Sequence, residues 1–268
     1  MSSPGHCRRE TLGPLPLSCL LVSQISREAT APTATQLRVG GERIDRHRHD
    51  EHQLVYVSTG VLAVSTESGS WAVSRDRAVW IPAGVWHEHR FYGPTSLHTL
   101  GFAVDAAPLP ADAPTLLAVS PLARELVIAA ASQKLSTPES HRLRAVLRDQ
   151  LRHSQIRPLV LPTAQDERLA AACSLVESDL TQPRTMRWLA HHTSTGERTL
   201  ARLFRTEFGT TYPQWRTTLR VFHAMIRLSE GATVTQTAHH CGWSTPSAFI
   251  DTFTRTLGQT PGCYRRRS

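Results

Sequence analysis

Residues 188–209 read WLAHHTSTGERTLARLFRTEFG, and residues 237–258 read TAHHCGWSTPSAFIDTFTRTLG. Both stretches have a histidine pair, a turn and an aromatic stripe that ends at glycine. Their second halves are related by a constant offset of 49, so that Leu200, Phe204 and Gly209 correspond to Phe249, Phe253 and Gly258. An internal repeat indicates that one structural unit occurs twice. Residues 184–267 therefore predict two copies of one small fold.

Each copy predicts a helix, a tight turn and a second helix. In the second copy Thr245 suits the N-cap, Pro246 the first helical position and Gly258 the left-handed residue that ends the helix. The apolar residues recur at helical spacing, as Leu200, Leu203, Phe204 and Phe208 in the first copy and Phe249, Phe253 and Leu257 in the second. Residues 213–229 between the copies predict one helix, which would hold the two units at a fixed separation.

Three arginines lie off the apolar stripe of the first copy and are predicted to face outward. Two short helices with an outward basic face are typical of the helix-turn-helix motif, whose second helix enters the major groove of DNA. Arg202 suits bidentate contact with guanine, whereas Asp251, at the same position of the second copy, could accept from a cytosine amino group or merely order its neighbours. The candidate DNA-contacting residues are Arg198, Ala201, Arg202, Arg205, Thr245, Ser247 and Asp251.

The basic excess of the chain is confined to the same region. From residue 184 onward there are 12 arginines, no lysine and four acidic residues, so the formal charge is +8. The whole chain has 30 basic and 22 acidic residues, which is also +8 and leaves 18 of each sign in residues 1–183. A basic excess localised in this way is the electrostatic signature of a nucleic-acid-binding segment.

The C-terminal region resembles the DNA-binding domain of the AraC/XylS family of transcription regulators, including Thr260-Pro261 and Tyr264-Arg265 at its end. The sequence departs from the family pattern in the first turn, where Ser194 stands at a position usually held by glycine. It departs again at Gly196, where the family usually has a serine cap. The resemblance implies an all-α domain with two helix-turn-helix motifs that binds double-stranded DNA.

Residues 38–104 show a different pattern, with short apolar or alternating segments at 54–57, 61–64, 71–73 and 78–81. Gly60 and Gly69 mark turns between these segments. Many short strands with glycine turns predict a sandwich or barrel of the jelly-roll kind. The expected fold class is therefore α+β, with an N-terminal β-barrel and a C-terminal all-α domain.

One spacing in the barrel is specific: Gly41, His47, His49, Gln53 and Gly60 are similar to the first cupin motif, and Pro82-x-Gly84-x-x-His87 to the second. Three imidazoles suit a divalent transition metal such as Zn, Ni, Cu or Fe(II). Gln53 stands where metal-binding cupins have an anionic glutamate, which favours a pocket for an organic effector over a metal. His52, His89 and His98 are expected at the surface or at strand edges.

The pattern divides the chain into four parts: a disordered tail over residues 1–37, a cupin-like effector-sensing domain over 38–110, a helical region over 111–163 and the DNA-binding domain over 164–268. The helical region predicts helices near 121–133 and 138–153 and an extended piece at 159–162. The family resemblance implies that such helices pair subunits; the alternative is that they only close the barrel. A further helix over 166–179 would lead into the DNA-binding domain.

Three classes of protein are compatible with these features. The first is an effector-responsive transcription regulator, similar to the branch of the family that includes the repressor of a nitroimidazole exporter. The second is a metal-dependent cupin enzyme with a helical appendage, and the third an architectural DNA-binding protein. The repeat and the localised charge favour a regulator without catalytic activity. Its expected partners are double-stranded DNA, a small-molecule effector, a second copy of the chain and RNA polymerase.

The sequence predicts a cytoplasmic protein with no membrane partner. There is no apolar run near 18 residues, the length that a membrane-spanning helix needs. The five cysteines are odd in number and show no Cys-x-x-Cys spacing, which favours a reducing compartment.

Overall fold

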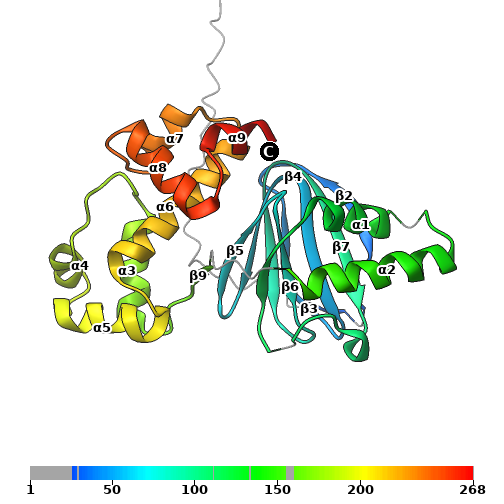
Figure 1. The fold of residues 1–268 in the computed structure, drawn as a ribbon. Coiled ribbons are helices and arrows are strands. Elements are labelled where there is room, and N and C mark those ends of the chain that lie inside the picture. The colour runs from blue at the N-terminus through cyan, green and yellow to red at the C-terminus, as the bar shows by residue number, and fades with distance from the viewer. Residues whose placement is uncertain (1–25, 29, 111, 133, 155–159, 268) are drawn as a thin grey trace, which may run out of the picture.

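The structure is a computed structural model that describes residues 26–28, 30–110, 112–132, 134–154 and 160–267. It has two parts, which lie side by side (Figure 1). A β-barrel with two helices on its outer side forms one part, and a group of helices forms the other. None of the described helices combines the length and the apolarity that a bilayer-crossing helix would need.

One mixed sheet forms the barrel. The strand order of the sheet is β1-β3-β7-β4-β5-β9. The longest strands, β4 and β7, lie at the centre of the sheet and pair along most of their length. Strand β2 also pairs with β7, and β6 pairs with β4 and β8. Among the strands of the described residues, β1 and β3 are the one parallel pair. The strands of the described residues are β1 (Ser26–Glu28), β2 (Ala34–Arg38), β3 (Arg43–His49), β4 (His52–Thr66), β5 (Gly69–Val73), β6 (Arg77–Ile81), β7 (His87–Phe102), β8 (Thr115–Ala118) and β9 (Val160–Pro162).

Alternation along the strands explains why the barrel has two apolar faces. Val55 and Val57 on β4 belong to the larger core inside the barrel, whereas Leu54 and Tyr56 belong to a second core on the outer face. Helices α1 (Pro121–Ala131) and α2 (Thr137–Arg152) cover that outer face (Figure 1) with Val127 and other apolar side chains. The two predicted helices are confirmed, and they close one side of the barrel.

The helical part follows the predicted repeat. Helix α6 lies between two smaller groups of helices (Figure 1), and its predicted inner residues, Trp215, Leu219, Phe222 and Ile226, are buried. The repeated units are α4–α5 and α7–α8, with α3 before them and α9 after them. The helices are α3 (Glu167–Glu177), α4 (Met186–His192), α5 (Glu197–Phe208), α6 (Tyr212–Ser229), α7 (Val234–His240), α8 (Pro246–Leu257) and α9 (Pro261–Arg267).

The barrel and the helical part pack against each other through α6, which contacts β4, β7 and β9. The apolar core inside the barrel continues into the core of the helical part without a break. A polar contact is added where the Gln259 side-chain amide donates to Asp76, at 3.3 Å. The connection between the barrel and the helical part is therefore a packed interface.

Two expectations about the chain boundaries are corrected. Strands β1 and β2 lie within the predicted disordered tail, so that prediction is wrong for residues 26–28 and 34–37; residues 1–25 lie outside the described residues. These strands are held by backbone hydrogen bonds to β3 and β7, which require no apolar periodicity. The sheet also extends beyond residue 110, because β8 and β9 pair with β6 and β5. Helix α9 was not predicted.

Candidate nucleic-acid interface and histidine cluster

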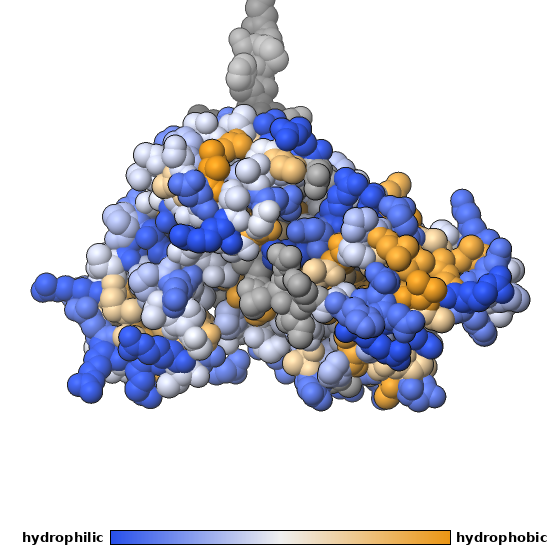
Figure 2. Space-filling model, viewed as in Figure 1, coloured by the Kyte–Doolittle hydropathy of each residue, from blue (hydrophilic) through white to orange (hydrophobic). Residues whose placement is uncertain are grey.

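Helix α5 has one buried and one exposed face. Leu200, Leu203 and Phe204 are at most 5% exposed and pack into the core of the helical part. Arg198 and Arg202 lie on the opposite side and are exposed, as is Arg205 in the last turn. Hydrophilic side chains project from the side of the molecule where α4 and α5 lie (Figure 2). The structure therefore places the three predicted arginines together on one free helical face, with Ala201 half-buried between them.

The turn before α5 requires a left-handed backbone at Ser194, whose φ is 50°. Ser194 is the one residue other than glycine with a positive φ among those that the structure describes. Its counterpart in the second unit is Gly242, with a φ of 78°. The amide nitrogens of both donate three residues back, to His191 in one unit and to His239 in the other. Ser194, which replaces the glycine usual in the family, therefore occupies a strained backbone conformation.

The two units differ in the length of the turn. Helices α4 and α7 are related by an offset of 48, whereas α5 and α8 are related by 49, so the second turn has one additional residue. Thr245 is the N-cap of α8, with its hydroxyl oxygen accepting from the amide of Ala248 at 3.2 Å. The equivalent position in the first unit is Gly196, which makes no side-chain cap.

The second recognition helix is less basic than the first. Thr245, Ser247 and Asp251 are all exposed, as predicted for residues that face a groove. Asp251 is the sixth residue of α8, and Arg202 is the sixth residue of α5, so the two helices carry opposite charges at the same position. Arg255 adds one exposed positive charge near the end of α8.

An arginine on α6 fixes the turn of the second unit. The Arg220 guanidinium lies 4.0 Å from the ring centroid of Trp243, and its Nε donates to the carbonyl of Cys241. Burial lowers the pKa of Arg220 to about 10, so the side chain keeps its charge at neutral pH. Cation–π contacts of this kind are worth more when they are desolvated. Arg220 therefore has a structural role, unlike the exposed arginines of α5.

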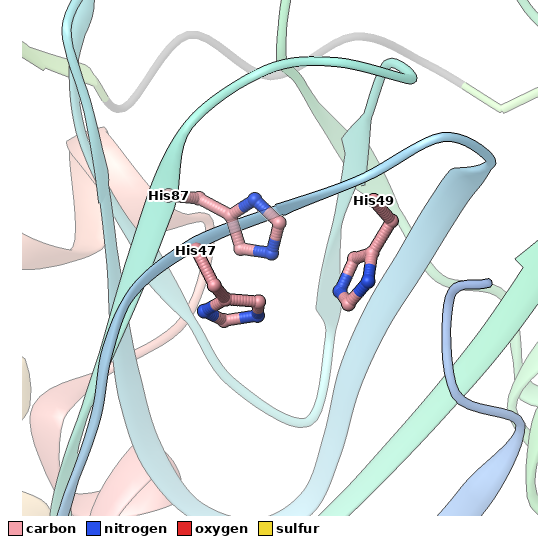
Figure 3. A group of neighbouring side chains, drawn as sticks. All are labelled: His47, His49 and His87. Carbon is pink, nitrogen blue, oxygen red and sulfur yellow. The ribbon is translucent and has the colours of Figure 1, made fainter. Parts of the chain in front are cut away.

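The predicted histidines of the barrel come together. His47 and His49 on β3 and His87 at the start of β7 are at most 6% exposed, and Figure 3 shows their rings gathered at one point. One nitrogen from each ring lies within 4.8 Å of the other two. His47 and His87 are direct partners in the β3–β7 ladder, and alternation places His49 on the same face as His47. The arrangement brings three potential metal ligands to one site.

Backbone carbonyls fix the tautomer of two of these rings. The Nδ1 atoms of His47 and His87 lie 2.7 Å and 2.9 Å from the carbonyl oxygens of Asp45 and Val85. Because a carbonyl only accepts, each Nδ1 must carry the hydrogen, which leaves the lone pair on Nε2. Burial, assisted by the neighbouring His47, lowers the pKa of His87 to about 3, and it also lowers the pKa of His49. The rings of His49 and His87 are therefore neutral at neutral pH, and a neutral imidazole is the form that binds a metal.

A carboxylate stands beside the cluster in a place that the sequence did not indicate. Glu28 on β1 lies opposite His49 in the parallel β1–β3 pair, and its Oε2 is 3.3 Å from His49 Nδ1. A carboxylate that holds the second nitrogen of a histidine is a common outer-shell feature of metal sites. Glu28 precedes the cupin motif and lies in the segment predicted to be a tail, so no sequence motif marks it.

The prediction for the other barrel histidines is wrong. His52, His89 and His98 are at most 3% exposed rather than at the surface. His98 bonds to Thr35 and Ser58, and His52 Nδ1 accepts from the amide of Ala83. Both ring nitrogens of His89 are buried and have no hydrogen-bond partner among the described residues. The ring centroid of His89 lies 5.3 Å from that of His87. The missed signal was the repeated His-x-His pattern at 47–49 and 87–89, which places each pair on one strand face.

Gln53 is also buried, on β4, with its Oε1 accepting no hydrogen bond from the residues that the structure describes. It pairs with Ile81 on β6 and with Gly101 at the far end of β7, whereas the histidines pair at the near end. The structure thus brings His47, His49 and His87 together, whereas the strand partners of Gln53 are Ile81 and Gly101.

The two parts define a class of protein: a transcription regulator that joins a cupin barrel to a duplicated helix-turn-helix domain. A family model for the helix-turn-helix domain matches residues 189–267, and one for the cupin domain matches residues 35–101. The HTH-type transcriptional regulator NimR of Escherichia coli (strain K12) is 32% identical over 224 residues, which are 82% of each chain. The protein belongs to the AraC family of transcription regulators and is a DNA-binding regulator.

Some similar proteins align with only part of this chain. The HTH-type transcriptional regulator GlxA of Rhizobium meliloti (strain 1021) is 32% identical over 101 residues, 37% of this chain and 31% of that protein. Among solved structures, the DNA-binding domain of AdpA in complex with a target DNA is 31% identical over 37% of this chain and 89% of its own, with a TM-score of 0.35. An AraC-type regulator from Chromobacterium violaceum is 27% identical over 38% of this chain and 93% of its own, with a TM-score of 0.37.

Proposed function

We propose that α5 and α8 read two successive major grooves on one face of a DNA duplex, about 34 Å apart. The observation that carries this proposal is the exposed face of α5. Its three arginines stand opposite a fully buried apolar stripe, and a solvated helix face with this charge suits phosphates and guanine edges. Arg202 would contact guanine, while Arg198 and Arg205 would contact bases or phosphates, with Ala201 against the groove.

The second helix would contribute differently. Thr245 and Ser247 lie at the start of α8, where hydroxyls can bond phosphates or base edges. Asp251 would accept from the amino group of cytosine, or order the side chains around it. We infer that the first unit supplies most of the affinity and that the second adds sequence discrimination.

We further propose that the protein acts as a homodimer in the cytoplasm. Leu122 on α1 and Val146 on α2 are 52% and 46% exposed, and Figure 2 shows an apolar patch where these two helices lie. Large apolar side chains grouped on a surface are typical of association sites. A second copy of the chain is the partner that such a patch suits in a family of regulators, and RNA polymerase would be contacted by another face.

The histidine cluster supports a second role, as a site for a divalent transition cation. Three imidazoles whose nitrogens converge, and a carboxylate beside His49, form a donor set that suits such an ion. We infer that the ion would be a regulatory or structural ligand rather than part of an enzyme, because the basic helix and the duplicated unit would have no role in catalysis. An organic effector bound to the barrel is the alternative.

Capture of genomic DNA tests the proposed function. Full-length protein would be mixed with sheared DNA from the genome that encodes it, and the bound fragments sequenced. We expect a small set of fragments upstream of genes. A variant with Arg198, Arg202 and Arg205 changed to Ala should lose this enrichment, whereas Arg43→Ala, at an exposed position of β3, should retain it. Equal enrichment with both variants would refute the proposed surface.

A further inference from the structure

A cavity of about 220 Å³ lies where the barrel meets the helical part. Since a cavity of about 150 Å³ holds benzene, this one has room for a substituted aromatic ring. The barrel contributes residues of β3, β4, β5 and β7, the connecting segment contributes β9, and the helical part contributes α3 and α6. Figure 1 shows β9 between the barrel and α3. His87 forms part of the wall, whereas His47 and His49 do not line it, so the cavity is distinct from the centre of the histidine cluster.

The charged side chains of the wall do not call for a charged ligand. Arg46 forms an ion pair with Glu67 and lies over the ring of Trp86. Glu177 on α3 has an interaction partner within the protein. Glu88 on β7 is partly exposed, so water solvates its carboxylate. Because a charge that is buried without a partner is costly, the cavity suits an uncharged molecule.

The rest of the wall is largely apolar. Leu161 on β9, Cys173 on α3 and Trp215 on α6 are at most 6% exposed. Burial raises the pKa of the Cys173 thiol, which therefore stays neutral. The hydroxyls of Ser65 and Ser70 bond to each other, at 2.9 Å. Strand β9 and helix α6 are in contact, so an aromatic body packed against Leu161 also reaches the indole of Trp215.

Trp215 also supplies a hydrogen-bond donor. Its indole Nε1 is buried and donates to no residue that the structure describes. A buried donor without an acceptor is costly, so an acceptor atom on a bound molecule would stabilise it. The uncharged molecule that suits this wall therefore carries an acceptor.

Two walls of the cavity reach the recognition helix α5. The ring of Trp215 packs against Phe204 and Phe208 of α5, with centroid distances of 5.4 Å and 6.1 Å. Helix α3, which forms another wall, also contacts α5. A molecule in the cavity is thus one layer of side chains away from the helix that carries the three exposed arginines.

We propose that this interdomain cavity binds a small uncharged aromatic molecule with a hydrogen-bond acceptor, of the aryl ketone class. The ring packs against Leu161 and Trp215, and the carbonyl oxygen accepts the indole hydrogen. Because the walls belong to the barrel, to β9 and to the helical part, the bound molecule ties the two parts together beside α5. Control of DNA binding by this molecule rests on the proposed function, whereas its binding does not.

Calorimetric titration of full-length protein without DNA tests the chemical class. The probes are acetophenone, benzoate and 1-phenylethylamine, which share a phenyl ring, are of equal size and carry an uncharged, an anionic and a cationic end group. Acetophenone should bind at one site, at least about tenfold more tightly than either of the others.

A pair of tryptophan variants tests the donor. Trp215→Phe keeps an aromatic ring and removes the indole hydrogen, so it should weaken acetophenone about fivefold. Trp80→Phe is the matched control, because the indole nitrogen of Trp80 is also buried without a partner among the described residues but belongs to the outer core of the barrel. Trp80→Phe should bind acetophenone as the wild type does.

A second pair of variants tests the position of the site. Ala170 on α3 lines the cavity, and Ala171 beside it is exposed. Ala170→Leu should fill part of the cavity and abolish binding, while Ala171→Leu should bind as the wild type does; circular dichroism would establish that all four variants are folded. Equal affinity for the three probes, no saturable acetophenone binding at millimolar concentration, unchanged affinity in folded Trp215→Phe, or full binding by folded Ala170→Leu would each overturn the proposal. Genomic DNA capture is unaffected by these outcomes, so the two proposals fail separately.

Discussion

Arg202 and Asp251 occupy the same position in the two recognition helices and carry opposite charges. Both side chains are exposed. Neither forms an ion pair with another of the described residues. A guanidinium can bond two acceptors of guanine, whereas a carboxylate only accepts and meets the amino group of cytosine. The duplicated units therefore suit different half-sites, and the DNA site is expected to be asymmetric within one subunit.

Arg202→Ala should weaken binding to the specific site by roughly 1–3 kcal/mol and relax the preference at one base pair. The expected loss follows from a bidentate contact that alanine cannot make. Fluorescence anisotropy on the captured site, and on sites substituted one base pair at a time, measures both effects. Arg43→Ala is the matched control, at an exposed position of β3 in the barrel. Unchanged affinity and preference would show that Arg202 does not read a base.

Ser194→Gly should raise the free energy of unfolding by about 0.5–1 kcal/mol, because Ser194 adopts a φ of 50° that costs a β-carbon-bearing residue more than glycine. The reverse change in the second unit, Gly242→Ser, should lower it by at least about 2 kcal/mol, since its Cβ would lie 2.1 Å from the carbonyl oxygen of Leu180. Urea unfolding followed by circular dichroism measures both. A destabilised Ser194→Gly protein, or a neutral Gly242→Ser, would contradict the strain assigned to this turn.

At the scale of elements, paired strands gather the barrel histidines. Strands β3 and β7 each present a His-x-His pair on one face, and their register puts His47 opposite His87. Strand β1 adds Glu28 from a segment that lacks any sequence motif. A site built on three strands is held by the sheet ladder, which keeps its ligands in position before any ion arrives.

The convergence of His47, His49 and His87 leads us to expect a bound metal ion. Protein purified without chelator should contain close to one equivalent of a divalent transition ion, because three imidazoles converge there. His49→Ala should lose the ion, since the site has no ligand to spare. His98→Ala is the matched control, a buried histidine of β7 outside the cluster. Elemental analysis decides: little metal in the wild type, or equal metal in His49→Ala, would leave the organic-effector alternative.

The exposed apolar side chains of α1 and α2 lead us to expect a dimer. The double variant Leu122→Glu, Val146→Glu should be monomeric, because two buried charges would face each other across the proposed two-fold interface. Val39→Glu is the control, at a residue that is 62% exposed and belongs to neither helix. Light scattering after gel filtration should give about twice the 29.7 kDa chain mass for the wild type and the control. A monomeric wild type, or a dimeric double variant, would remove this interface from the account.

At the scale of the whole molecule, the sequence indicated best what depends on local pattern. The helices of the repeat, their caps and their buried stripes follow from periodicity and from Thr245 and Gly258, and the structure agrees with them. The cupin spacing also located His47, His49 and His87, because alternation and motif length fix positions within a strand pair. These features are encoded within a few residues of each other.

Features that depend on contacts between distant segments were missed. Strand β1 is ordered by pairing with β3, so neither the strand nor Glu28 has a local signature. His89 was misplaced because burial is decided by what covers a strand, which one sequence does not reveal. The cavity between the two parts was not foreseen, since its lining residues are far apart along the chain and come together only where α6 packs against the barrel.

Hydroxyl-radical footprinting of the full-length protein on a captured genomic site tests most directly whether α5 and α8 form one DNA-binding surface. The account predicts, for each subunit, two protected patches on the same face of the duplex, centred about one helical turn, 10–10.5 base pairs, apart. Changing Arg198, Arg202 and Arg205 to Ala should remove the patch that belongs to α5. A single protected patch per subunit, or protection unchanged by this variant, would contradict the account.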